Sequence, residues 1–582
     1  MREDDRVDTA NTCPMPARAE PQLMSEGAAR MTLLVITLLF VLWGLCYIYR
    51  TSAMVGGHRT FLLWDDAMIS MRYARNLAEG HGLTWNPDGE RVQGITNLGL
   101  TLIMALIHLL PFSRWDAALV YQLLSLAMAL ACLPLVYRLA MGLFHDRSVA
   151  VGAGLVTALY APFAIWSLQG ADVPAVALPL LAALVWLVEA ESPGRPWPAK
   201  VFPVLALAIL VRPDATVAYV VVLACCAWRE GTRAPAFRRG CLLLLAIWAG
   251  LLAFSYLYYG DPLPNTFYLK ATGSPRLLVL KTGLQELVTF IEGVSPLLVL
   301  LMGALLIPRM RRDRALWPSA AVVLSSFAYS VWVGGDWTWT LPSRFIAPSM
   351  PVFIVLLLGA WCTLCRALGE RAAGARSWLF AAGAALFILQ LNPEGALTEW
   401  LSFSVETLNK QENWRQARIG LYLRDQTVPG TTVAYHWAGT AAYFAERPGI
   451  DVLGKSDRHI AKMTVDRFIP GHSKWDWDYV LWQRRPDVFV DESRGLLARP
   501  DFEQAYRGAR TGAGELLFVR RGSESRLDDP KILYVTISAM RALGIGSQME
   551  LPQRKPLFQL GGLAAFGAAN CLAWLFRPRP HR

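Results

Sequence analysis

The sequence has few charged residues. Asp, Glu, Lys and Arg make up 17% of the 582 residues, whereas soluble domains carry about 25%. Hydrophobic residues make up 54%, and the mean hydropathy is +0.33. This composition excludes an ordinary soluble enzyme and predicts a membrane protein with several spans.

Cysteine is also missing where disulfide bonds would matter. The chain has nine cysteines and none of them lies in the long polar region 392–550, which excludes a disulfide framework there. Cys362 and Cys365 form a CxxC pair inside an apolar run, where packing explains them better than redox chemistry or metal binding. The net charge of +11 does not indicate nucleic-acid binding, because the arginines occupy short loops between apolar runs.

What the chain does have is a series of apolar runs. The N-terminal segment 1–30 is polar and is predicted to be disordered, and Met31–Tyr49 is predicted to be an uncleaved first span. Twelve further runs follow, at 97–112, 117–137, 149–168, 173–190, 201–211, 215–228, 240–259, 287–307, 316–333, 345–365, 378–391 and 556–576.

The basic loops predict how these runs cross the membrane. Short loops rich in Arg and Lys face the cytoplasm, and every basic loop obeys this rule if 97–112 is an interfacial helix. The result is about twelve spans. The predicted parts are a transmembrane domain 31–391 with a catalytic outer loop 50–112, an extracytoplasmic domain 392–550, and a last span with a basic tail in 551–582.

The region 392–550 is predicted to be a small α/β domain. Strands are expected at 431–435, 450–453, 487–491 and 515–520, with helices at 438–445 and 475–483. Strands that alternate with helices favour a mostly parallel sheet. Trp475 and Trp477 are compatible with stacking on a sugar ring or with an aromatic seam against the membrane domain.

The acidic pair Asp65-Asp66 opens the polar stretch after the first span. A pair of carboxylates at a membrane surface is a candidate for function, because intramembrane and membrane-edge charges are expensive. The simpler interpretation is that Asp66 caps a helix over Ala67–Glu79, but a cap needs only one of the two. On that ground Asp65 is the expected general base.

The predicted topology brings further polar motifs to the same outer face. Each has a simpler alternative: a proline kink for Arg212-Pro213-Asp214, a helix-dipole charge for Asp172, an interfacial aromatic for Trp337, and a lipid-headgroup contact for Lys270. Their convergence on one face raises the functional interpretation above these alternatives.

A long stretch, WDDAMISMRYARNLAEGHGLTWNPDGERVQGITN at residues 64–97, resembles the first outer loop of the glycosyltransferase C superfamily. Within that superfamily the chain is most similar to the class of mycobacterial terminal arabinofuranosyltransferase. The later stretches RPD, PLPNTFYLKATG, VGGDW with RF, LGKSDRHIA and GHSKWD fit the same family in order. One departure is Gly170-Ala171-Asp172, where Gly-Leu-Glu is expected.

The resemblance implies a mainly α fold, a polytopic transmembrane helical domain of the glycosyltransferase C type with a small extracytoplasmic α/β domain near the C-terminus. It implies an enzyme of the bacterial cytoplasmic membrane, surrounded by lipids and active on the periplasmic side. Such enzymes move a sugar from a polyprenyl-phosphate donor to an extracytoplasmic glycan or protein.

The expected catalytic residues are Asp65 and Asp66, where direct attack with one base predicts inversion at the anomeric carbon. The carboxylate pair also leaves open a bound divalent cation, because hard cations prefer oxygen ligands. The expected donor-binding residues are Arg72, His81, Arg212, Lys270 and Arg344, and the expected substrate contacts are Asp172, Asp214, Asn265, Asp336, Trp337 and His472.

Two other classes stay open. A flippase or transporter of lipid-linked sugars would show discontinuous helices at the bilayer midplane and internal repeats, and the sequence has no convincing repeat. A non-catalytic scaffold for envelope assembly would bind a partner through the outer domain, and the intact acidic pair argues against it.

Overall fold

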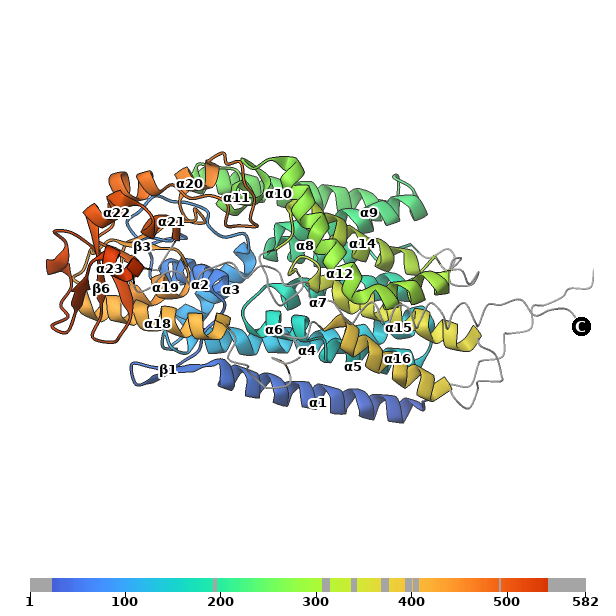
Figure 1. Cartoon of the computed structure of the whole chain (residues 1–582). Helices are drawn as coiled ribbons and strands as arrows, with labels where there is room; N and C mark the ends of the chain where they lie inside the picture. The colour runs from blue at the N-terminus through green and yellow to red at the C-terminus, as the bar shows by residue number, and fades with distance from the viewer. Residues whose placement is uncertain are drawn as a thin grey trace, which may run out of the picture.

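The computed structural model of the chain describes residues 24–191, 196–305, 314–336, 343–367, 376–392, 400, 408–490 and 494–542. Long helices form one body of the molecule, and a smaller α/β domain lies at one end of it (Figure 1). The predicted fold class, mainly helical with a C-terminal α/β domain, is confirmed.

The helical body begins with α1 (Glu26–Thr51), which a short hairpin joins to the helices of the first loop. The elements of this part are β1 (Ala53–Val55), β2 (His58–Thr60), α2 (Asp65–Ala78) and α3 (Leu98–Leu109). The remaining helices of the body are α4 (Ala117–Phe144), α5 (Arg147–Ala158), α6 (Ala161–Leu168), α7 (Val173–Glu189), α8 (Val201–Val211), η1 (Pro213–Ala215), α9 (Thr216–Glu230), α10 (Pro235–Tyr259), α11 (Asn265–Ala271), α12 (Arg276–Leu305), α14 (Leu316–Val333), η2 (Ala347–Ser349), α15 (Met350–Ala367) and α16 (Arg376–Leu391).

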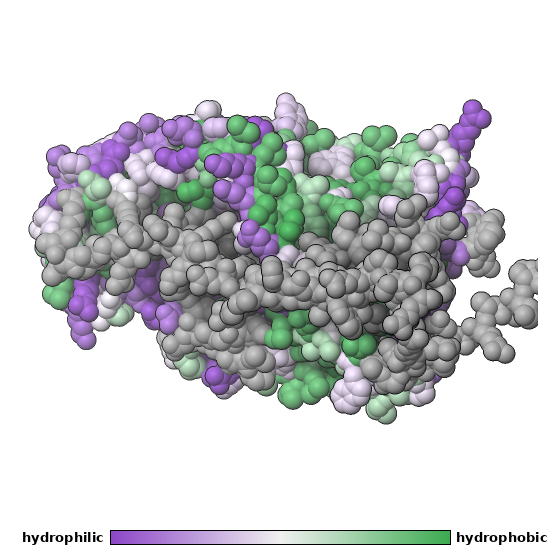
Figure 2. All heavy atoms as spheres, turned by 45° about the vertical axis from the view of Figure 1, so that its right-hand side comes forward, coloured by the Kyte–Doolittle hydropathy of each residue, from purple (hydrophilic) through white to green (hydrophobic). Residues whose placement is uncertain are grey.

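Five described helices are long and apolar enough to cross a membrane, or six spans if α5 and α6, bent by 52° at their junction, count as one. Shorter apolar helices of 10–17 residues add to these. The chain is therefore a multi-pass membrane protein, and Figure 2 shows hydrophobic side chains over the helical body and hydrophilic ones over the end that holds the α/β domain. The number of about twelve spans stays a prediction, and the last predicted span lies outside the described residues.

The segment predicted to be interfacial forms the short helix α3, which packs against α2. Its 12 residues measure about 18 Å along the axis, less than the roughly 30 Å of a hydrocarbon core. The length agrees with the predicted interfacial helix, whose position in a membrane stays a prediction.

Local sequence signals explain where several helices begin and end. Asp146 starts α5, because its Oδ1 accepts hydrogen bonds from the N–H groups of Ser148 and Val149 at 2.7 and 3.1 Å. Gly334 ends α14 with φ +88°, a left-handed conformation that favours glycine. The end of α14 at Gly334 turns the chain toward Asp336.

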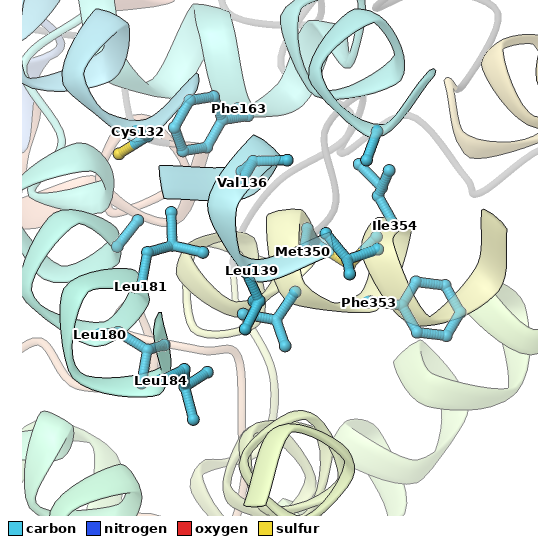
Figure 3. Close-up of a cluster of buried hydrophobic side chains, with 14 of the residues drawn as sticks. Cys132, Val136, Leu139, Phe163, Leu180, Leu181, Leu184, Met350, Phe353 and Ile354 are labelled. Atoms are coloured by element: carbon cyan, nitrogen blue, oxygen red, sulfur yellow. The ribbon is translucent and has the colours of Figure 1, made fainter. Parts of the chain in front are cut away.

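The core of the helical body lies where α4, α6, α7 and α15 meet (Figure 3). Apolar side chains from these four helices are almost fully buried and point toward one another, and they include Cys132, Val136, Leu139, Phe163, Leu180, Leu181, Leu184, Met350, Phe353 and Ile354. Close packing of this kind holds the outer ends of the helices in one arrangement.

The α/β domain contains a six-stranded sheet in the order β4-β3-β5-β7-β6-β8. The strands are β3 (Val433–Tyr435), β4 (Gly449–Asp451), β5 (Val488–Val490), β6 (Tyr506–Arg510), β7 (Leu516–Arg520) and β8 (Leu533–Val535). The helical segments are α18 (Leu408–Gln426), α19 (Thr440–Ala445), α20 (Arg458–Lys462), η4 (Tyr479–Arg484), α21 (Arg494–Leu497), α22 (Pro500–Ala505), η5 (Glu524–Arg526) and α23 (Ile537–Ala542).

The prediction of a mostly parallel sheet is wrong, because three of the five strand pairings are antiparallel. β3 pairs in parallel with β4 and β5, but the other three pairings are antiparallel. The sequence reading missed β6 and β8, and a short turn joins β6 to β7, which forces the two strands to run in opposite directions. Trp477 packs on Phe489 inside the domain, with ring centroids 6.1 Å apart.

Ion pairs define the two ends of the helical body. At one end, Arg138 pairs with Glu189, Arg229 with Glu191 and Arg366 with Asp146, which gathers the ends of α4, α7, α9 and α15. At the other end, Arg212 pairs with Asp172 and Arg344 pairs with Asp66. Which of these two ends faces the cytoplasm stays a prediction.

Candidate active site

The acidic pair occupies the first turn of α2 and faces the α/β domain. The helix begins at Asp65, and its N-cap residue is Trp64, which makes no side-chain hydrogen bond. The expectation that Asp66 caps the helix is therefore wrong, and with it goes the reason for choosing Asp65 as the base. The environments of the two carboxylates must decide between them.

Asp65 is held by the backbone of the α/β domain. Its Oδ1 accepts hydrogen bonds from the N–H groups of Gly439 and Thr440 at 3.0 and 2.8 Å. Its Oδ2 is buried and has no hydrogen-bond partner among the described residues. Burial raises the pKa of Asp65 to about 7, against the opposing effect of the nearby Lys455.

Asp66 lies between two cations and stays open to solvent. Its Oδ1 is 2.5 Å from Nζ of Lys455, and its Oδ2 is 2.9 Å from Nη2 of Arg344. About two fifths of its side chain, 40%, is exposed. Lys455 and Arg344 lower the pKa of Asp66 well below its usual range, although burial opposes them. Asp66 is thus an ionised carboxylate that a substrate can reach.

Arg344 joins Asp66 to a second carboxylate. Its Nε is 3.0 Å from Oδ2 of Asp336, whose own N–H donates to Oε2 of Glu286 at 2.8 Å. The guanidinium therefore spans two acids from different elements, a geometry that the planar Arg fork allows. This contact draws the segment after α14 toward the start of α2.

Lys270 is a cation without a carboxylate partner. Its Nζ lies 4.7 Å from the centroid of the Phe345 ring, and no ion pair links it to a carboxylate of the described residues. Burial lowers the pKa of Lys270 to about 8, and the neighbouring Arg344 adds to this effect. The carboxylates of Asp336 and Asp66 act on the pKa of Lys270 in the opposite direction, although neither forms an ion pair with it.

Arg212 is already neutralised by two carboxylates. Its Nε and Nη2 donate to Asp214 at 2.8 and 2.6 Å, and its Nη1 donates to Asp172 at 3.0 Å. The same Nη1 lies 3.4 Å from the carbonyl oxygen of Arg344. Arg212 therefore lies next to Arg344 with two carboxylates on its guanidinium, and its expected role in donor binding stays a prediction.

Two further expected donor-binding residues do not reach this cluster. Arg72 is buried and spends its donors on Trp85, Asn86, Ala442 and Arg447, so that it ties α2 to the α/β domain. His81 is exposed beyond the far end of α2, whose 14 residues separate it from the acidic pair by about 20 Å.

The remaining expected substrate contacts divide in the same way. Asp172 and Asp214 serve Arg212, whereas Asp336 belongs to the cluster around Arg344. Asn265 is buried and donates to the carbonyl oxygen of Gly454 at 3.2 Å, which is a structural contact. His472 lies close enough to Asp66 to affect its pKa. Trp337 lies outside the described residues.

The acidic pair does not fit a divalent cation. Asp66 already faces two cations, which would repel a metal ion, and one oxygen of Asp65 accepts two backbone N–H groups. Within the described part of the chain no three His, Cys, Asp or Glu residues are grouped as metal ligands. The cluster uses Arg and Lys where a metal-dependent site would use the ion.

Sequence reasoning missed Lys455 and His436 as parts of the site. Both follow strands of the parallel half of the sheet, His436 directly after β3 and Lys455 four residues after β4. In α/β sheets, ligand-binding groups gather at the carboxyl ends of parallel strands, where the strand order reverses. This rule, applied to the predicted strands, would have pointed to both residues.

The comparisons with known proteins match the domain and the fold separately. Residues 406–527 match a family model described as a domain of unknown function (DUF8728), which covers most of the α/β domain. No curated protein matches the chain.

Solved structures match most of the chain. ArnT from Cupriavidus metallidurans in the apo state is 14% identical, with a TM-score of 0.50 and coverage of 80% of this chain and 94% of that one. The oligosaccharyltransferase AglB from Archaeoglobus fulgidus, in complex with an inhibitory peptide and a dolichol-phosphate, is 12% identical, with a TM-score of 0.51 and coverage of 94% and 84%. These likenesses show a fold of the glycosyltransferase C type.

Proposed function

We propose that this chain is an integral membrane glycosyltransferase. It moves a sugar from a polyprenyl-phosphate donor to an extracytoplasmic acceptor by inverting attack, with an Asp as general base. The observation that carries the proposal is the position of Asp66, an accessible carboxylate between Arg344 and Lys455 with Lys270 nearby. A carboxylate base beside three cations suits an attacking hydroxyl and a departing phosphate.

The proposed reaction has one displacement step. The acceptor hydroxyl oxygen attacks the anomeric carbon, the bond from that carbon to the phosphate oxygen breaks, and the electron pair leaves with the phosphate. Asp66 takes the hydroxyl proton. Arg344 and Lys270 stabilise the charge that grows on the phosphate, because preorganised cations act strongly in a site shielded from water.

Asp66 fits the role of base better than Asp65. A substrate hydroxyl can approach Asp66, of which 40% is exposed, whereas Oδ2 of Asp65 is sealed within the protein. The two hydrogen bonds from Gly439 and Thr440 instead give Asp65 the role of aligning α2 with the α/β domain.

The structural neighbours support the class of donor. The AglB structure was solved with a dolichol-phosphate, a polyprenyl phosphate, and its fold matches this chain with a TM-score of 0.51. The resemblance of residues 64–97 to the arabinofuranosyltransferase class makes arabinofuranose the first sugar to test. The basic end of the helices would face the cytoplasm of a bacterium and the site its periplasm.

A transfer assay tests the proposal. The full chain is reconstituted in liposomes with radiolabelled polyprenyl-phosphate arabinofuranose and a mixture of cell-envelope glycans and peptides. We expect label in the acceptor fraction and release of polyprenyl phosphate. Movement of the labelled lipid across the bilayer without transfer would identify a flippase. If neither transfer nor movement occurs while a control enzyme is active, a scaffold is favoured.

A further inference from the structure

Three aromatic rings of the α/β domain form a wall beside the acidic pair. His436 and Trp437 have ring centroids 5.4 Å apart, and Trp437 and His472 have centroids 5.8 Å apart. The planes cross at 80° and 62°, so the rings do not simply stack into a core. His436 and Trp437 are both partly exposed. His436, Trp437 and His472 together form this ring wall.

The ring wall is held at a set position next to the site. His436 and Trp437 follow β3 directly, and Gly439 and Thr440, two residues further on, donate to Asp65. A side chain at position 439 would meet the backbone oxygen of Asp65 at 1.9 Å, so glycine is required for this close approach. The wall therefore cannot move without moving the start of α2.

The wall lies beside the cations of the site. Lys270 approaches the loop of His472, since a side chain at Gly471 would lie 3.7 Å from Cε of Lys270. Asp66 interacts electrostatically with His472 and is ion-paired with Arg344 and Lys455, and Lys455 in turn acts on both histidines of the wall. The rings, the carboxylate and the cations thus border one site.

The chemistry of the wall differs from that of the cations. Burial lowers the pKa of His436 to about 4 and of His472 to about 3, with Lys455 adding to both effects. Both imidazoles are therefore neutral near pH 7, and a neutral imidazole donates one hydrogen bond and accepts another. Nδ1 of His436 and Nε1 of Trp437 are buried and have no hydrogen-bond partner in the described chain. Buried polar groups in proteins are usually hydrogen-bonded.

We infer that the ring wall is the acceptor subsite, and that it binds a sugar ring of a glycan. The face of Trp437 packs against the apolar face of the sugar, and His436 and His472 share hydrogen bonds with its hydroxyl groups. The inference rests on the proposed function, because it places the acceptor hydroxyl next to Asp66, the proposed base.

A glycan fits this wall better than a peptide does. Peptides that bind beside a sheet commonly add a strand to a free edge, but β3, which leads into the wall, is paired on both sides by β4 and β5. The groups on offer are an indole face and two neutral imidazoles, which match a ring with hydroxyl groups and carry no charge for an ionic side chain.

Saturation-transfer NMR on the full chain in nanodiscs tests the inference. The probes are arabinofuranosyl, galactofuranosyl and mannopyranosyl tetrasaccharides, an uncharged tetrapeptide, and polyprenyl phosphate as the donor-side probe. We expect at least one saccharide to bind, and Trp437→Ala to weaken its affinity about ten-fold or more, as removal of a stacking aromatic does. Trp437→Phe should retain most of the affinity, which separates stacking from a fold defect.

The matched control is Trp475→Ala, in the same domain, where Arg467 stacks on the indole at 3.5 Å. It should leave saccharide binding unchanged. The inference is overturned if no saccharide binds, if Trp437→Ala binds as wild type does, or if only the tetrapeptide binds. Failure of polyprenyl phosphate to bind would instead contradict the proposed function, so the two failures are distinguishable.

Discussion

At the scale of single residues, neighbours in the sequence have opposite chemistry. Asp65 and Asp66 are adjacent, yet burial raises the pKa of the first to about 7, and two cations hold the pKa of the second well below its usual range. The difference comes from their surroundings: burial raises the pKa of Asp65 although the N–H groups of Gly439 and Thr440 oppose it, whereas Lys455 and Arg344 pair with Asp66 and outweigh its burial.

This difference predicts the effects of two amide substitutions. Asp66→Asn should reduce transfer by about 10²–10⁴-fold, because the amide cannot take a proton. Asp65→Asn should keep most of the activity, since its amide oxygen can still accept from Gly439 and Thr440. Initial transfer rates at saturating donor, with thermal unfolding as the control for folding, measure both.

The pH profile gives an independent check. If Asp66 is the base, kcat/KM should stay level as pH falls from 7.5 to 5, because the pKa of Asp66 lies well below this range. An acidic limb near pH 7, the pKa of Asp65, would assign the base to Asp65.

The pKa of Lys270 predicts how the affinity for the donor changes at alkaline pH. Its pKa is lowered to about 8, so it is charged below that pH and neutral above it. Affinity for polyprenyl phosphate should therefore fall as pH rises through about 8. The phosphate has already lost its second proton below this pH, so the fall reports Lys270. In Lys270→Arg the fall should move to higher pH, because a guanidinium does not deprotonate there. Lys281→Arg, an exposed position on α12, is the control and should keep the wild-type profile.

At the scale of elements, the site depends on how α2 is fastened to the α/β domain. Arg72 donates to the carbonyl oxygens of Trp85, Ala442 and Arg447 and to the side chain of Asn86, and its guanidinium lies 4.4 Å from the centroid of the Trp85 ring. One side chain thus connects α2, the loop that follows it and the loops around α19. Asp65 makes the second connection, at the other end of the same helix.

Arg72→Lys is predicted to loosen this connection without touching the charged cluster. A lysine cannot reach four acceptors at once, and each buried acceptor left without a donor costs about 1–3 kcal/mol. We expect a lower unfolding temperature and faster proteolysis between the α/β domain and the helical body. His81→Ala, exposed beyond the end of the same helix, should change neither. Equal stability of Arg72→Lys and wild type would contradict the role given to Arg72.

At the scale of the whole molecule, the two ends of the helical body carry different sets of ion pairs. Arg138, Arg229 and Arg366 lie at one end, and the cluster around Asp66 and the α/β domain lie at the other (Figure 1). Because short basic loops stay in the cytoplasm, the α/β domain is predicted to be extracytoplasmic.

Labelling with a membrane-impermeant thiol reagent measures this orientation in intact cells. Lys531→Cys, exposed in the α/β domain, should react, and Thr232→Cys, exposed between α9 and α10, should react only after permeabilisation. Wild-type protein reports the background from the native cysteines. Reaction of Thr232→Cys in intact cells would reverse the topology and place the site in the cytoplasm.

The sequence by itself determined the class of the molecule and predicted the residues that are proposed for its site. The low charge content required a membrane protein, the positions of basic loops predicted which motifs share one end, and Asp65, Asp66, Lys270 and Arg344 stood out within those motifs. These properties follow from local composition and from hydrophobic runs, which do not depend on distant contacts.

Only the tertiary structure decided which residues act together. Arg72 and Arg212 look like free cations in the sequence, but distant carbonyl and carboxylate groups occupy their donors. Lys455 lies 389 positions from Asp66 and still pairs with it. Partners, burial and the resulting pKa values arise when separate elements pack together, and no local pattern of residues records that packing.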